Sequence, residues 1–133
     1  PTVPPPPAPP PVTFDMAVGV GGSGAIYGKG IAADGAGGFL VTGYFTGTAS
    51  FGATTLSSAG SYDVFVMRVS GSGDVSWAIR AGGSSADYGR GIASDGLGGA
   101  FVTGNVGGSA SFGATTLVSS GGVAYSKILK VSG

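Results

Sequence analysis

Hydrophobic and polar residues alternate through most of the chain after residue 26, which is the pattern of strands buried on one face. Turns rich in Gly and Asp, such as Asp34-Gly35-Ala36-Gly37-Gly38, separate the alternating runs. Short extended pieces are predicted at Ala49–Leu56 and Ala110–Leu117. Full strands are predicted at Tyr27–Ala33, Phe39–Phe45, Tyr62–Val69, Asp74–Ala81, Tyr88–Ser94, Ala100–Val106 and Val123–Val131. The expected fold class is all-β.

The composition favours the same fold class. Gly supplies 29 of the 133 residues, and Glu and Gln are absent, so strong helix formers are scarce. The length suits one domain with a modest core.

An internal repeat organises the chain. Gly21–Gly60 aligns without gaps on Gly82–Gly121, with 27 of 40 positions identical. The constant step from Gly21 to Gly82 is called the repeat offset below. Such self-similarity indicates two copies of one supersecondary unit, each of which needs a neighbour to bury its hydrophobic face. We therefore expect a first unit at residues 21–83 and a second at residues 84–133.

Three motifs recur in both units: Tyr-Gly-x-Gly-Ile-Ala-x-Asp-Gly-x-Gly-Gly, then Val-Thr-Gly, then Ser-Phe-Gly-Ala-Thr-Thr-Leu. Together with the strands at Tyr62–Val69 and around Trp77, they resemble the bacterial β-propeller repeat of large secreted and surface proteins. The resemblance covers nearly all of residues 13–133. It implies two propeller-like, four-stranded antiparallel blades, and a scaffold rather than a known activity.

The chain departs from that family at a few positions. The first turn, where the family often has Asn, has Gly38 and Gly99. Asp63 is replaced in the second unit by Ala124 or Tyr125.

The frame of the repeat leaves the two ends of the chain mismatched. The second unit stops at Lys130-Val131-Ser132-Gly133, which matches Arg68-Val69-Ser70-Gly71, so its fourth strand is missing. Within the stretch from Phe14 to Gly22, residues 15–22 align with Ser76–Gly83 at the repeat offset, with Met16 in the place of Trp77. The chain thus begins with a spare fourth strand and ends without one.

Strand donation between copies would resolve this mismatch, with residues 13–20 of one subunit completing the second blade of another. Two blades cannot close around an axis, because closed propellers typically have about four to eight blades. An unpaired edge at Val123–Val131 would expose a row of N–H and C=O groups. The alternative is that residues 13–20 lie as a frayed edge. The expected donor residues are Phe14, Met16, Val18 and Val20, and the expected acceptor residues are Tyr125, Ile128, Leu129 and Val131.

All eight prolines lie in residues 1–11, so residues 1–12 should form an extended polyproline arm of roughly 30–35 Å. We expect this arm to lie against a neighbouring subunit. Thr2 leaves room for an O-linked glycan. The arm prolines in question are Pro4, Pro5, Pro6, Pro7, Pro9, Pro10 and Pro11.

The composition argues against an enzyme. His and Cys are absent, which excludes the usual nucleophilic triads, thiolate zinc sites and imidazole bases. Zero net charge with 9% charged residues gives no electrostatic footprint for nucleic acid, and no window is apolar enough for a membrane span. We therefore expect no catalytic residue, no cofactor and no metal ion.

Three weaker alternatives concern individual motifs. A calcium loop at Asp34–Gly38 or Asp95–Gly99 would have a single carboxylate, so a structural turn is favoured. The Gly-Lys-Gly and Gly-Arg-Gly stretches at residues 28–30 and 89–91 lack the rest of a phosphate loop, so close approach of neighbouring blades is favoured. The repeated aromatic residues suit either a sugar site or core packing. They are Tyr27, Tyr88, Phe51 and Phe112.

The preferred function is that of an extracellular structural subunit that polymerises with itself, head to tail, into a filament. A heterologous contact of this kind closes into a ring or propagates as a filament, depending on the rotation between subunits. The alternative is a ring of three or four copies that acts as a carbohydrate-binding module. The expected partners are other copies of the chain, with glycans as a further candidate, but neither nucleic acid nor a membrane.

Overall fold

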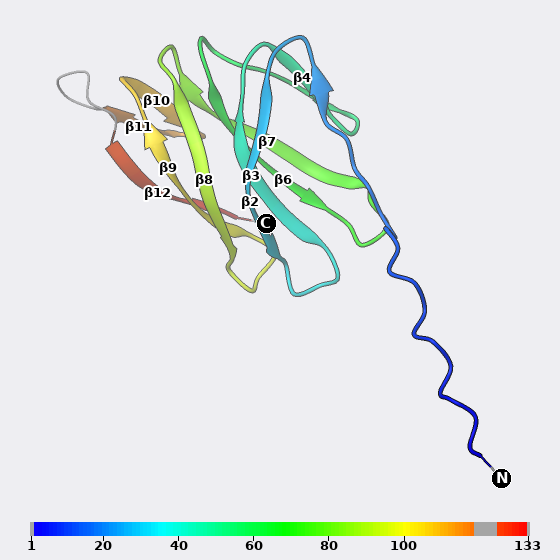
Figure 1. Ribbon diagram of the computed structural model, residues 1–133. Helices are drawn as coiled ribbons and strands as arrows, with labels where there is room; N and C mark the ends of the chain where they lie inside the picture. Colours follow the sequence, from blue (N-terminus) through cyan, green and yellow to red (C-terminus); the bar gives the residue numbers. More distant parts are fainter. Residues whose placement is uncertain (1, 119–124, 133) are drawn as a thin grey trace.

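The computed structural model describes residues 2–118 and 125–132, and their regular structure consists entirely of β-strands (Figure 1). The all-β prediction is confirmed. The strands are β1 (Gly21–Gly22), β2 (Ile26–Ala33), β3 (Phe39–Phe45), β4 (Thr48–Phe51), β5 (Thr54–Ser57), β6 (Asp63–Val69), β7 (Val75–Gly83), β8 (Asp87–Ser94), β9 (Ala100–Val106), β10 (Ser109–Phe112), β11 (Thr115–Val118) and β12 (Tyr125–Val131).

The first unit forms an antiparallel sheet in the order β7-β6-β3-β2, called the first sheet below. At Gly82 and Gly83, the end of β7 also pairs with β10, so β10 and β11 extend this sheet to six strands. The second unit forms a sheet in the order β12-β9-β8, called the second sheet, in which β12 is an edge. The remaining strands form a small sheet in the order β1-β4-β5.

The pairing follows the sequence repeat. Gly21 pairs with Ser50 in the first unit, and Gly82 pairs with Ser111 in the second, so both partners move by the repeat offset. The third strand of the second unit, β12, is displaced by one further position relative to β6 of the first unit. Phe39 pairs with Val69, whereas Ala100 pairs with Val131. The counterpart of Asp63 is therefore Tyr125, which opposes Val106 as Asp63 opposes Phe45.

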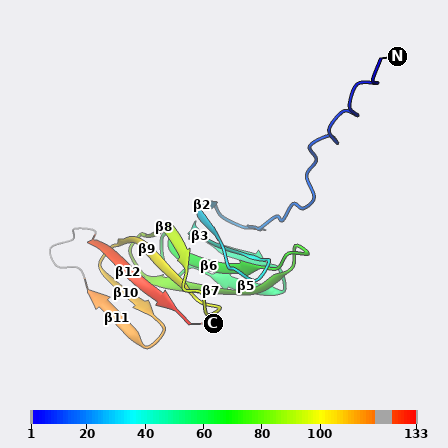
Figure 2. The same ribbon diagram turned by 90° about the horizontal axis from the view of Figure 1, so that it is seen from below.

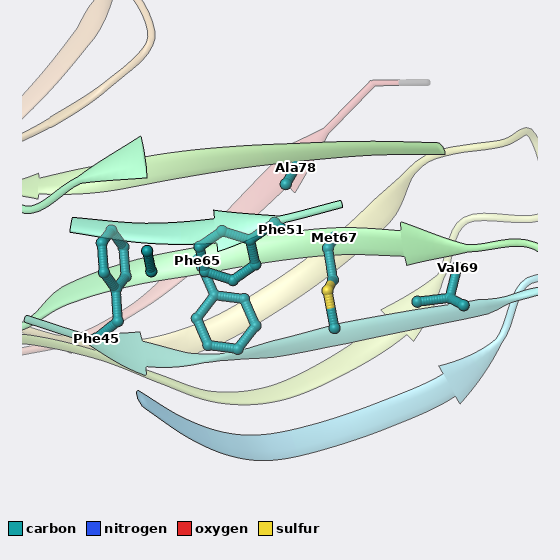
Figure 3. Close-up of a cluster of buried hydrophobic side chains, with 7 residues drawn as sticks. Phe45, Phe51, Phe65, Met67, Val69 and Ala78 are labelled. Carbon is teal, nitrogen blue, oxygen red and sulfur yellow. The ribbon is translucent and has the colours of Figure 1, made fainter. Parts of the chain in front are cut away.

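Two clusters of buried side chains form the core. In β6 the alternation of a strand places Val64 and Val66 on one face and Phe65, Met67 and Val69 on the other, and all five are buried. The first cluster consists of Phe45, Ala49, Phe51, Phe65, Met67, Val69 and Ala78, and its rings gather between β3, β4 and β6 (Figure 3). The second cluster joins the two sheets and consists of Leu40, Val64, Val66, Ala100 and Val102.

Glycines allow the two units to approach each other closely. A Cβ atom on Gly30 would lie 3.1 Å from the Cα of Gly91, and one on Gly89 would lie 2.6 Å from the carbonyl oxygen of Gly43. Strands β2 and β8 therefore lie backbone to backbone, the arrangement that the sequence favoured for the Gly-Lys-Gly and Gly-Arg-Gly stretches.

The structure differs from the predicted strands in two places. Each predicted extended piece is a hairpin of two strands, because Gly52 and Gly113 adopt positive φ angles of 62° and 61° and reverse the chain. Residues 13–20 form no strand within this chain. Of the predicted strand at 123–131, residues 123 and 124 lie outside the described residues.

Candidate self-assembly site

Strand β12 has one neighbour, β9, so the backbone groups along its other edge have no ladder partner among the described strands. The predicted acceptor side chains divide between its two faces. Leu129 and Val131 pack against the second cluster, whereas Ile128 points the other way and is 80% exposed. The backbone of Tyr125 lies in the strand, but its side chain is outside the described part of the structure.

A groove runs beside this free edge. It has a volume of about 240 Å³ and lies between β12 and the β10–β11 hairpin, lined by Phe112, Thr115, Leu117, Ile128, Leu129 and Lys130. A cleft of about 270 Å³ shares three of these residues and reaches across to Val64, Val66 and Ile79 of the first sheet. An open channel lined by both apolar and polar side chains therefore borders β12.

The first unit shows what occupies the corresponding place there. Strand β7 pairs with β6 and contacts the β4–β5 hairpin. At Gly52, in the turn of that hairpin, an added Cβ atom would lie only 2.8 Å from the Cβ of Val75 in β7. At Gly113, the counterpart of Gly52, an added Cβ atom would meet nothing within 4 Å. The space filled by β7 in the first unit is thus open in the second.

The donor segment, residues 13–20, lies extended over the first sheet of its own chain. Met16, Val18 and Val20 are partly buried against the first cluster. Met16 and Val18 approach the turn between β6 and β7, where an added Cβ atom on Gly73 would lie 3.3 Å from the Met16 sulfur. Phe14, the fourth predicted donor residue, is 99% exposed.

The same relation to a neighbouring sheet exists between the two units. Trp77 and Ala81 of β7 are partly buried against the second cluster, which includes side chains of the second sheet. Their counterparts at the repeat offset are Met16 and Val20, which pack against the first sheet. The donor segment therefore lies on the first sheet as β7 lies on the second.

The arm extends away from the sheets (Figures 1 and 2). Every residue from Thr2 to Phe14 is exposed, including Thr2 itself and the prolines at positions 4–7 and 9–11. That the arm lies against a neighbouring subunit stays a prediction.

The two Asp-Gly turns are closed by their own carboxylates. Oδ1 of Asp34 accepts hydrogen bonds from the N–H groups of Ala36 and Gly38, at 2.7 and 2.9 Å. Oδ2 accepts from Nε of Arg68 at 2.6 Å. The backbone donors above all, with help from Arg68, hold the pKa of Asp34 below its ordinary value of 3.8. This carboxylate is already engaged by the protein, as a structural turn requires.

The second unit repeats this arrangement. Oδ1 of Asp95 accepts from the N–H groups of Leu97 and Gly99, at 2.7 and 2.8 Å, and these donors lower its pKa. Lys130 lies 3.7 Å from Oδ2, in the place of Arg68. No group of three or more acidic residues that could hold a metal ion occurs among the described residues. The sequence analysis did not predict that Arg68 and Lys130 pair with these two carboxylates. The two cations do occupy equivalent positions once the third strand is displaced by one residue.

Two buried carboxylates between the units were also missed. Asp63 and Asp87 are fully buried, and both lie within 2.8 Å of where a Cβ atom on Gly82 would be. Burial raises the pKa of Asp87, partly offset by hydrogen bonds from the N–H groups of Gly83 and Gly107, and the charge of Asp63 raises it further. Oδ2 of Asp63 accepts from Arg80, whereas its Oδ1 is buried without a partner in the described part of the chain.

The repeated aromatic residues separate into core and surface positions. Phe51 is fully buried in the first cluster, and Phe112 lines the groove beside β12. Tyr27 and Tyr88 belong to a partly exposed group of four tyrosines. Core packing therefore accounts for Phe51, but not for the tyrosines.

The family model of the β-propeller repeat matches residues 76–108, which run from β7 through β9. No curated protein matches the chain. In the described residues, no helix is long and apolar enough to span a membrane. The resemblance noted in the sequence is thus confirmed over residues 76–108, which are similar to the β-propeller repeat.

Proposed function

We propose that the protein is a structural subunit that polymerises head to tail by donating residues 13–20 to the free edge of β12 in another copy. One observation carries the proposal: the place beside β12 that β7 fills in the first unit is open in the second. The donor segment has the sequence pattern of that missing strand. Among the described residues, this segment also pairs with no strand of its own chain.

The family match supports the same division of the chain. The matched residues begin at Ser76, so the repeat unit of the family starts with the β7 strand and continues into the next sheet. The corresponding unit, one repeat offset earlier in the sequence, starts at Asp15. On this division, residues 15–22 would become the opening strand of a repeat whose preceding blade is supplied by another copy.

The repeat also gives the register of the proposed joint. In the first sheet, Ile79 of β7 pairs with Val66 of β6. Their counterparts are Val18 and Ile128, so Val18 of one copy should pair with Ile128 of the next. Val66 is 3% exposed because it faces the second sheet. Ile128 should become buried in the same way, against the first sheet of the copy that donates the strand.

In this arrangement each copy contributes two blades, the second of which is completed by its neighbour. We favour an extracellular filament, because the arm extends beyond the donor segment and has no role inside a closed ring. A ring of three or four copies that binds carbohydrate is the second candidate, favoured by the partly exposed tyrosines. Neither candidate requires a catalytic residue, a cofactor, a nucleic acid or a membrane.

Cysteine trapping tests the joint directly, because the chain contains no Cys. A Val18→Cys chain and an Ile128→Cys chain are mixed and oxidised. Directly paired residues on antiparallel strands are close enough for a disulfide. We expect a mixed dimer to accumulate.

The matched control replaces Ile128→Cys by Leu97→Cys, since Leu97 is similarly exposed, at 83%, but lies in the turn between β8 and β9 and not on β12. If the Leu97→Cys chain cross-links to the Val18→Cys chain as readily, the proposed joint is wrong. Negative-stain microscopy of the unmodified protein separates the two assemblies: long threads indicate a filament, and discs of uniform mass indicate a ring. Monomers at all concentrations would contradict both.

A further inference from the structure

Lys130 of β12 makes long contacts within its own chain. Its Nζ lies 3.7 Å from Oδ2 of Asp95 and 5.5 Å from the ring centroid of Phe101. The corresponding ion pair of the first unit, between Arg68 and Asp34, is closer, at 2.6 Å. The side chain of Lys130 is also more exposed, at 51% against 23% for Arg68. A lysine ammonium has three N–H donors, so Lys130 can bind a second acceptor without releasing Asp95.

The first unit shows where such a second acceptor lies. Nη1 of Arg68 donates a hydrogen bond of 2.9 Å to Oγ of Ser76 in β7. Ser76 lies at the point where the register between β6 and β7 shifts, next to the pair of Val69 with Val75. A register shift of this kind redirects a side chain. The strand that completes the first sheet therefore supplies an oxygen acceptor to the cation of β6.

At the proposed joint, a carboxylate takes the place of this hydroxyl. Asp15 is the counterpart of Ser76 at the repeat offset, and Lys130 is the counterpart of Arg68 once β12 is displaced by one position. In the register given above, Asp15 of the donating copy therefore lies beside Lys130 of the accepting copy. Within its own chain Asp15 is exposed, accepts a hydrogen bond from Thr13 at 3.2 Å, and forms no ion pair with any described residue.

We propose that Asp15 of the donating copy and Lys130 of the accepting copy form an ion pair that selects the donor segment for the free edge of β12. This inference rests on the proposed function and adds the charge by which the edge recognises its strand. A strand with Ser at this position would offer Lys130 a neutral acceptor, whereas a carboxylate makes a charge-assisted hydrogen bond. The corresponding contact in the first unit is exposed, so the ion pair should weaken as salt is added.

Single charge substitutions in the full-length chain give the first test, with light scattering across a concentration series at low salt. Asp15→Lys places two cations together, and it should raise the concentration needed for assembly about two- to tenfold. Asp15 is exposed in the subunit, so this substitution should leave folding unchanged. Lys130→Asp should also weaken assembly. Since it removes the partner of Asp95 as well, urea unfolding of dilute protein checks that this subunit is folded.

Two double variants make the result specific. Asp15→Lys with Lys130→Asp restores opposite charges across the joint, and it should assemble at a lower concentration than Lys130→Asp alone. The matched control combines Asp74→Lys with Lys130→Asp. It has the same net charge, but the substituted carboxylate is an exposed one just before β7. This control should assemble no better than Lys130→Asp. Equal recovery in both double variants, or an unchanged assembly concentration with Asp15→Lys, would overturn the ion pair.

The cross-link between positions 18 and 128 separates the ion pair from the joint itself. The Val18→Cys chain is compared with and without Asp15→Lys, and each is mixed with the Ile128→Cys chain. We expect the mixed dimer to accumulate more slowly with Asp15→Lys, by a margin that narrows at high salt. Equal rates at low salt would refute the ion pair and leave the joint in place. Absence of the cross-link from both mixtures would refute both.

Discussion

Replacing Ile128 by Ser gives the sharpest test of the joint. Ile128 is 80% exposed in the single chain, so the substitution should leave folding of the subunit nearly unchanged. Its counterpart Val66 is 3% exposed, which indicates how deeply Ile128 should be buried in the joint. Full burial of such a side chain contributes about 1.5–3 kcal/mol. The loss should raise the protein concentration needed for assembly by roughly 10- to 150-fold.

The assay is light scattering across a concentration series, with urea unfolding of dilute protein as a check on the subunit. Leu97→Ser removes a side chain of similar size and exposure from a turn, and it should assemble like the wild type. If Ile128→Ser assembles at the wild-type concentration, the reasoning from the repeat is refuted. The same conclusion would follow if Ile128→Ser and Leu97→Ser raised the assembly concentration equally.

Three further predictions concern other parts of the chain. Met16→Asp places a charge on the face of the donor segment that packs against the first cluster, and size-exclusion chromatography should show no assembly. Gly43→Ala should destabilise the fold by at least about 1–3 kcal/mol in urea unfolding, because its Cβ atom would overlap the carbonyl oxygen of Tyr27. Gly28→Ala, which meets nothing within 4 Å, should be nearly neutral in the same assay. Folding lowers the pKa of Asp34, so its carboxylate contributes to the free energy of unfolding above pH 3.8. That contribution is lost as the pH falls through the folded pKa. Asp34→Asn should therefore lose less stability than the wild type between pH 5 and about 2, as measured by urea unfolding at each pH.

The strands could be predicted from the sequence because alternation and Asp-Gly turns are local signals. Strands β3 and β9 begin and end where the pattern places them, at Phe39–Phe45 and Ala100–Val106. The hairpins at β4–β5 and β10–β11 were expected only as single extended pieces, since the sequence does not give the φ angles of Gly52 and Gly113.

The groups that depend on tertiary contacts could not be predicted in the same way. Asp87 occupies the position that Ile26 has in the first unit. Its buried carboxylate accepts hydrogen bonds from the N–H groups of Gly83 and Gly107, which lie outside β8. Tyr27 and Tyr88 were noticed as repeated positions. Their contacts with Tyr44 arise from tertiary structure. Strand β2 pairs with β3 and β8 packs against both, which brings Tyr44 between Tyr27 and Tyr88.

Strand β7 is held by both units at once. It pairs with β6 along most of its length and with β10 at Gly82 and Gly83. A single repeat unit is therefore not a separate folding unit. If either unit unfolded, β7 would lose some of its hydrogen bonds. Amide protons in the middle of β7 should exchange with solvent only when the whole chain unfolds, and thermal denaturation should be a single cooperative transition.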